Sequence, residues 1–154
     1  SGERLWPVSD AKKPKQFMSL PDGETFLQSA IIRAAALDIS GNICIVTRKD
    51  WTGLVIEDVL ALSKRLGKPE ILAKVLVMSE PCGKNTAPAI AWTAQYLLSL
   101  PRAESVNILM MASDHVIKPL DSFVKDAHTA CWHADRGNLV SFAITPTVAS
   151  TGSC

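Results

Sequence analysis

The sequence predicts an α/β fold in which helices cover both faces of a mostly parallel sheet. Short runs of apolar, β-prone residues alternate along the chain with segments of ten or more residues that have helical periodicity. This alternation is typical of βαβ units, whose crossover helices cover a parallel sheet. The chain has 154 residues, of which 47% are hydrophobic and 20% charged, and neither a repeat nor a linker divides it. We therefore expect one domain with a substantial core.

The first elements follow from periodicity and punctuation. Apolar residues at helical spacing predict a helix over 24–37, and the apolar run 43–47 predicts a buried strand. Asp50 or Thr52 is expected to cap a second helix, which continues to Leu66, where a glycine and a proline end it.

The middle of the chain repeats the alternation. A strand is expected over 74–78 and a turn over 80–83. Asn85 is expected to cap a helix that continues to Leu98, and a third buried strand is expected over 106–111.

The last elements complete the expected sheet. A helix is expected over 120–136, with Asp121 as its cap and Gly137 as its stop. A fourth strand is expected over 138–144.

Composition excludes several classes of function and location. The formal net charge is +1, so no overall attraction to nucleic acid or to an anionic membrane is expected. The chain has no apolar run of membrane-spanning length and no signal peptide. Its four cysteines lack paired short spacing, which suits a reducing compartment. We therefore expect a cytoplasmic protein.

The opening segment contains the residue types that bind a polyphosphate. Pro7 and Pro14 interrupt regular structure, and Gly2, Arg4 and Lys15 lie in the resulting loop. Backbone amides beside a glycine, an arginine fork and a lysine charge together can hold phosphate oxygens. Alternatively, the basic residues of this segment form only a solvated surface run.

Ligands of an open parallel sheet collect at the carboxyl ends of its strands. This rule selects the loop before Pro14, the turn after Met78 and the residues after Met111. In the last of these, Asp114 is well placed to hold a hard cation such as Mg²⁺ beside a phosphate. Alternatively, Asp114 caps the next turn.

The stretch 80–90 is expected to join the second strand to a helix. A carboxylate there, Glu80, could accept the adjacent N–H donors on the Watson–Crick edge of guanine. The alternative is an ordinary strand–turn–helix connection in which Asn85 is the N-cap.

Five short motifs occur in an order that resembles the mannose-1-phosphate guanylyltransferases, a family of sugar-1-phosphate nucleotidyltransferases. They are R-L-W-P at 4–7, P-K-Q-F at 14–17, E-P-C-G-K-N-T-A-P-A-I at 80–90, S-D-H-V-I at 113–117, and F-A-I-T-P-T with a later T-G within 142–152. The resemblance implies a Rossmann-like three-layer αβα fold and transfer of GMP from GTP to mannose 1-phosphate, giving GDP-mannose and pyrophosphate. It also implies Mg²⁺ as cofactor, and GTP and mannose 1-phosphate as partners.

The resemblance implies a role for each matching residue. Arg4 and Lys15 would be catalytic, Asp114 would bind the metal, and Thr151 and Gly152 would bind the sugar. The nucleotide-binding residues would be Ser1, Gly2, Glu3, Arg4, Glu80, Pro81, Gly83, Asn85 and Thr86.

The chain departs from the family pattern at several positions. Lys84 stands where the family has arginine, which loses the planar fork, and Asp10 stands where arginine is frequent. Ser153 and Cys154 replace the usual continuation after Thr-Gly. We expect residues 1–154 to be a partial nucleotidyltransferase domain that lacks its first strand and its C-terminal sugar-binding portion, and to be inactive alone.

Two other functions remain open. One is a nucleotidyltransferase with a different base or sugar, and the other is a non-catalytic relative that binds nucleotide sugars. The sequence also leaves the oligomeric state open, a homo-oligomer included.

Overall fold

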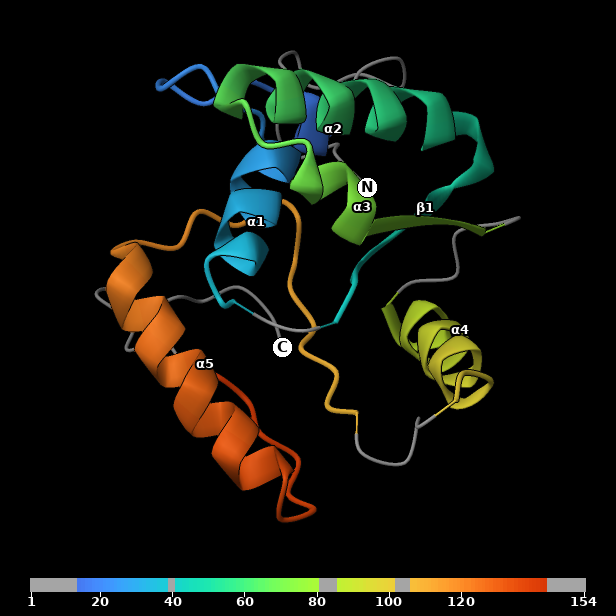
Figure 1. Cartoon of the computed structure of the whole chain (residues 1–154), viewed down its shortest axis with the longest axis vertical. Helices are drawn as coiled ribbons and strands as arrows, with labels where there is room; N and C mark the ends of the chain where they lie inside the picture. The colour runs from blue at the N-terminus through green and yellow to red at the C-terminus, as the bar shows by residue number, and fades with distance from the viewer. Residues whose placement is uncertain (1–13, 39–40, 81–85, 102–105, 144–154) are drawn as a thin grey trace, which may run out of the picture.

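The computed structural model describes residues 14–38, 41–80, 86–101 and 106–143. Its core is a βαβ unit in which β1 (Ile43–Arg48) and β2 (Val75–Glu80) pair in parallel through α2 (Thr52–Leu66). The register places Ile43 opposite Val75 and Arg48 opposite Glu80. The expected fold class, α/β with a parallel sheet, is thus confirmed (Figure 1).

Helices lie on both sides of the strand pair. In Figure 1, α2 lies above the strands, and α4 (Thr86–Leu98), which contacts β1, lies below them. The short α3 (Glu70–Lys74) leads directly into β2. Alternate strand residues such as Ile43 and Val77 pack on the core formed with α1 (Phe26–Ala35) and α2. Side chains of a strand alternate between its faces, so Cys44 and Met78 belong to the opposite face.

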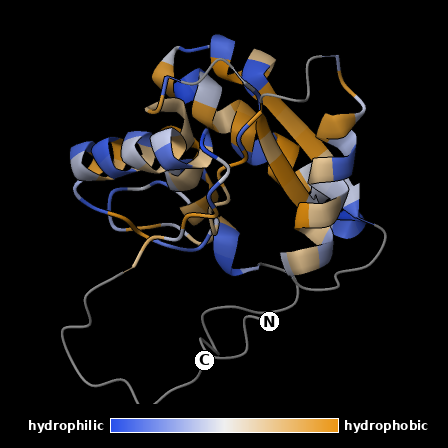
Figure 2. Ribbon diagram, turned by 90° about the horizontal axis from the view of Figure 1, so that it is seen from below, coloured by the Kyte–Doolittle hydropathy of each residue, from blue (hydrophilic) through white to orange (hydrophobic). Residues whose placement is uncertain are grey.

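The main core lies between α1, α2 and α3. Its buried members are Phe17, Leu27, Ile31, Val55, Val59, Leu62 and Ile71. The hydropathy colouring follows this arrangement, with hydrophobic strands in the interior and mixed helices around them (Figure 2). A smaller cluster of Leu37, Phe123 and Ala127 joins α5 (Leu120–Ala134) to the end of α1.

The helix ends differ from the expectations in ways that local chemistry explains. Thr25 caps α1 in a capping box with Gln28, one residue into the expected helix. Neither Asp50 nor Thr52 caps α2, because the 3₁₀ turn η3 (Lys49–Trp51) leads directly into it. At the other end, Gly67 adopts φ 62°, the left-handed conformation that a glycine C-cap favours.

The start of α5 also differs, and α3 was not expected at all. Pro119 precedes α5, so Asp121 lies inside its first turn rather than at its cap. There, its negative charge interacts favourably with the positive, N-terminal end of the helix dipole. The expected cap Asn85 of α4 lies outside the described residues.

Within the described residues, two of the four expected strands are not observed. Residues 106–111 and the described part of the last expected strand, 138–143, have no strand assignment. Most of their apolar side chains are exposed, Leu139 and Ile108 among them. The reason is physical: β-prone residues become a strand only where a neighbouring strand supplies partners for their backbone groups. Instead, Phe142 stacks 6.2 Å from Phe123 of α5, measured between ring centroids.

Candidate active site

Two of the expected site residues, 99 positions apart in the sequence, lie together. The Lys15 Nζ atom is 3.4 Å from Asp114 Oδ2. Lys15 begins the 3₁₀ turn η2 (Lys15–Phe17), and its ammonium also lies 5.4 Å from the centroid of the Phe26 ring on α1. The lysine is therefore held from two sides, by a carboxylate and by an aromatic face.

This ion pair is open to ligands. The Lys15 and Asp114 side chains retain 31% and 43% of their exposure. An ion pair as accessible as this contributes only about 0–1 kcal/mol to stability. A phosphate or a cation can consequently exchange with it at little cost to the fold.

Asp114 lies in a turn after the extended segment, as the alternative interpretation of this residue also proposed. A buried arginine of α1, Arg33, binds the backbone of this turn through two hydrogen bonds. Arg33 Nη1 donates to the carbonyl of His115 at 3.1 Å, and Nη2 donates to the carbonyl of Ala112 at 3.3 Å. Burial lowers the pKa of Arg33. Sequence reasoning missed this residue, although its phase three positions after Ala30 puts it on the buried face of α1.

The carboxyl ends of β1 and β2 carry a second group of polar residues. Glu80 is the last residue of β2, is half-buried and lies in register with Arg48. One residue earlier, Ser79 Oγ lies 2.6 Å from Thr52 Oγ1 at the start of α2, which ties the strand end to the helix. The expected nucleotide-binding Thr86 is the first residue of α4 and is exposed.

The remaining expected site residues lie outside the described parts of the chain. They are Ser1, Gly2, Glu3, Arg4, Pro81, Gly83, Asn85, Thr151 and Gly152.

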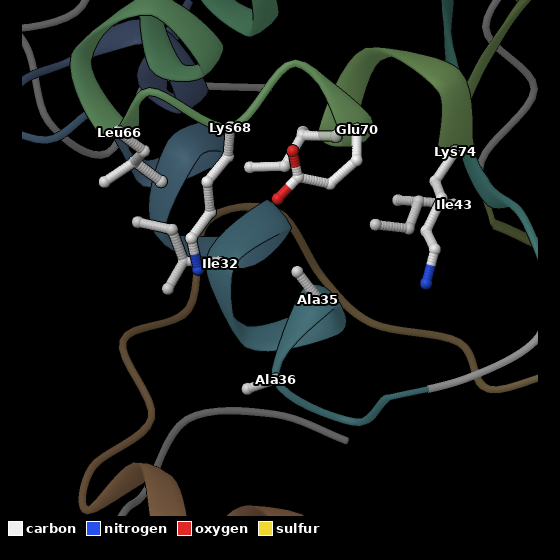
Figure 3. A pocket seen from close by; sticks show the side chains of 9 residues that line it. Ile32, Ala35, Ala36, Ile43, Leu66, Lys68, Glu70 and Lys74 are labelled. Atoms are coloured by element: carbon white, nitrogen blue, oxygen red, sulfur yellow. The ribbon is translucent and has the colours of Figure 1, made fainter.

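A cavity of about 330 Å³ lies elsewhere, between the ends of α1 and α2, α3 and β1 (Figure 3). Apolar side chains such as Ile32, Ile43 and Leu66 line it, and Lys68 and Glu70 lie at its edge. Neither Lys15 nor Asp114 lines this cavity, nor does any other expected site residue that the structure describes, so the cavity is separate from the Lys15–Asp114 pair.

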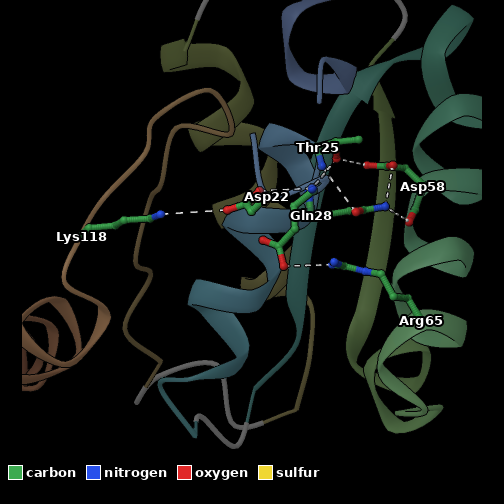
Figure 4. A network of polar contacts seen from close by, with 7 residues as sticks. Asp22, Thr25, Gln28, Asp58, Arg65 and Lys118 are labelled. Carbon is green, nitrogen blue, oxygen red and sulfur yellow. Dashed lines mark hydrogen bonds and ion pairs between the residues drawn. The ribbon is translucent and has the colours of Figure 1, made fainter. Parts of the chain in front are cut away.

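A polar network fixes α1, which carries both Phe26 and Arg33, against α2 (Figure 4). Thr25 Oγ1 donates to Asp58 Oδ2 at 2.6 Å, and Gln28 Nε2 donates to Asp58 Oδ1 at 2.9 Å. Burial is the largest influence on Asp58 and raises its pKa, whereas the two donors act in the opposite direction.

The Asp114 carboxylate fits a hard cation that takes its remaining ligands from water and a bound phosphate. Asp114 is an oxygen donor, and the described residues contain no cluster of three or more His, Cys, Asp or Glu side chains that could enclose a metal. Mg²⁺ commonly uses one or two carboxylates and takes its other positions from water and substrate phosphates. A single exposed carboxylate beside a lysine matches that mode of binding.

Comparison with known families gives a match that covers almost the whole chain. Residues 1–152 match the model of the nucleotidyl transferase family. The chain belongs to this family. Among the described residues, no helix is long and apolar enough to cross a bilayer.

Several curated proteins similar to this nucleotidyl transferase chain are named mannose-1-phosphate guanylyltransferases. A mannose-1-phosphate guanylyltransferase of Salmonella muenchen is 40% identical over 152 residues, which are 98% of this chain and 30% of the relative. Enzymes with the same name from Salmonella montevideo and Escherichia coli K12 are 36% and 34% identical over 152 residues, which are 99% of this chain and 30% of each relative. The chain thus spans about 30% of the length of these relatives. No solved structure matches it significantly.

Proposed function

We propose that the protein to which this chain belongs is a cytoplasmic mannose-1-phosphate guanylyltransferase. It transfers GMP from GTP to mannose 1-phosphate and releases GDP-mannose and pyrophosphate. One observation carries the proposal: the lysine and the aspartate of two family-like motifs lie 3.4 Å apart in a chain whose relatives bear this enzyme name.

The chemistry requires charge neutralisation and alignment more than a covalent step. The sugar phosphate attacks the α-phosphorus of GTP while pyrophosphate leaves in line. Lys15 places its ammonium beside the transferring phosphate, and Arg4 binds the neighbouring phosphate oxygens with its planar fork. The absence of a nucleophile–base pair among the proposed site residues is consistent with direct transfer.

Asp114 is the residue that would hold Mg²⁺. A bound Mg²⁺ would supply positive charge at the phosphate oxygens during transfer. In the structure, the Lys15 ammonium lies 3.4 Å from the same carboxylate and neutralises it. Lys15 and Asp114 therefore both serve one phosphate position, the lysine directly and the aspartate through the cation.

The other proposed contacts divide between base and sugar. Glu80 at the end of β2 accepts hydrogen bonds from the N1–H and N2–H₂ groups of guanine. Thr151 and Gly152 contact the mannose phosphate. The remaining nucleotide contacts are assigned to Ser1, Gly2, Glu3, Pro81, Gly83, Asn85 and Thr86.

The test measures GDP-mannose formation by the intact protein, together with calorimetric binding of GTP, ATP and UTP. We expect selective binding of GTP and a rate reduced about a hundredfold or more in Lys15→Met. Lys118→Met is the matched control, because this lysine is exposed and pairs only loosely with Asp22 at 4.0 Å. Equal binding of the three nucleotides would leave a nucleotidyltransferase of other specificity, and GTP binding without turnover would indicate a non-catalytic relative.

A further inference from the structure

One buried guanidinium, that of Arg33, binds the backbone of the turn that carries Asp114. Arg33 is 2% exposed, and its two terminal nitrogens donate to the carbonyls of Ala112 and His115, which lie on either side of Asp114 in the sequence. On the other side, the guanidinium lies 5.8 Å from the centroid of the Phe123 ring of α5. One side chain therefore joins α1, the Asp114 turn and α5.

Burying the Arg33 charge costs free energy that a purely structural contact would not require. Among the described residues, Arg33 forms no ion pair with a carboxylate, and its Nε atom has no hydrogen-bond partner. Burying a charge without a counter-charge is expensive, and an apolar side chain of similar size would pack at lower cost. Local rules of this kind are broken mainly where function requires it.

The geometry explains what the charge achieves. The fork of a guanidinium is planar, so two acceptors bound to it are fixed in both distance and direction. Because the carbonyls of Ala112 and His115 are bound in this way, the backbone between them has little freedom. The Asp114 carboxylate is then directed to the position in which it meets Lys15 at 3.4 Å.

We propose that Arg33 is a positioning residue that orients Asp114 for the cation and thereby sets the affinity of the site for the metal. The inference rests on the proposed function, since it takes Asp114 as the metal ligand. Arg33 itself contacts neither the cation nor the substrate.

The experiment measures Mn²⁺ binding to the intact protein by electron paramagnetic resonance, with GTP at saturation. Arg33→Met keeps the length of the side chain but removes every donor, and Arg33→Lys keeps the charge but offers no planar fork. Loss of a residue that orients a metal ligand typically weakens metal binding about 10–100-fold. We expect about tenfold weaker Mn²⁺ binding in Arg33→Met and a smaller loss in Arg33→Lys, with GTP binding in EDTA unchanged.

Arg65→Met is the matched control, because Arg65 also joins two distant segments: it lies on α2 and pairs with Glu24, before α1, at 3.0 Å, away from the Asp114 turn. Circular dichroism establishes the temperature below which each variant is folded, and all binding is measured there. A merely structural Arg33 would lower the melting temperature and leave Mn²⁺ affinity unchanged, which would overturn the proposal. An equal loss of GTP binding in EDTA would also overturn it, because the arginine would then support the whole site.

Asp114→Asn separates this inference from the proposed function. If Asp114→Asn abolishes Mn²⁺ binding while Arg33→Met leaves it intact, only the role of Arg33 fails. If neither variant changes Mn²⁺ binding, the assignment of Asp114 as metal ligand fails, and the role of Arg33 fails with it.

Discussion

The hydroxyl of Thr25 serves two elements at once, so its removal is expected to weaken the contact between α1 and α2. Thr25 Oγ1 accepts from the Gln28 amide at 3.0 Å, which caps α1, and donates to the Asp58 carboxylate at 2.6 Å (Figure 4). Thr25→Ala deletes both bonds, and Thr25→Ser retains the hydroxyl and serves as the control.

The expected magnitude follows from the two lost bonds. Loss of an N-cap hydroxyl costs about 0.5–2 kcal/mol. Loss of a hydrogen bond to a charged group costs about 1.5–3 kcal/mol. Because one hydroxyl makes both bonds and Gln28 still supports the half-buried carboxylate, the two costs are not independent, and we expect a total of about 2–3 kcal/mol.

Urea denaturation followed by tryptophan fluorescence provides the assay, since Trp51 packs on the same core. The free energy of unfolding is compared among the wild type, Thr25→Ala and Thr25→Ser. A value for Thr25→Ala within about 0.5 kcal/mol of Thr25→Ser, the range of an ordinary surface change, would refute the role given to the hydroxyl.

The same variant has a distinctive pH dependence. Burial raises the pKa of Asp58, so the folded state binds this proton more readily than the unfolded state does. The contribution of Asp58 to stability therefore improves as pH falls through its folded pKa toward the unfolded value near ~3.9. Thr25→Ala removes a donor to the carboxylate and raises that pKa further. Its deficit relative to the wild type should consequently be largest at neutral pH and shrink as the pH falls toward the unfolded pKa. A deficit independent of pH would contradict this account.

Three further predictions use the same assays. Leu62→Ala, at a side chain with 0% exposure, should destabilise the protein by about 3–5 kcal/mol in urea, and Leu62→Met by less than about 1.5 kcal/mol. Asp58→Asn should abolish the pH-dependent difference between Thr25 variants, so a difference that persists would assign it to another group. Phe26→Leu should lower GDP-mannose formation about two- to fivefold, the equivalent of a lost cation–π contact of about 0.5–1 kcal/mol, and an unchanged rate would exclude that ring as a support for Lys15.

Sequence patterns predicted the elements that depend on local information. The helical spacing of apolar residues located α1 and α2, capping and stop residues located α4 and α5, and the apolar runs located β1 and β2. The short α3 was missed because Pro69 was interpreted only as the end of α2. A proline is equally suited to precede a helix, and α3 begins at the next residue, Glu70.

The sequence predicted the charged residues of the candidate site but not the residues that position them. Lys15 and Asp114 were selected from the sequence, and the structure brings them together. The residues that hold them were not selected. Phe26 was counted only as an apolar residue of a helix face, and Arg33 was not considered, although its phase places it on the buried face of α1. Their roles depend on which distant segment packs against α1, and the sequence pattern of α1 alone carries no such information.

The position of Asp114 has a different physical cause from the one that the sequence suggested. The expectation relied on the rule that ligands collect where parallel strands end, with 106–111 as the strand before Asp114. That segment forms no strand pairing in the described part of the chain, so the described sheet does not position the Asp114 turn. Helix α1 positions the turn instead. Its Arg33 binds the backbone on both sides of Asp114, and its Phe26 ring packs against Lys15, the lysine that pairs with the Asp114 carboxylate. Disruption of the 106–111 backbone should therefore affect metal binding less than loss of the single Arg33 fork.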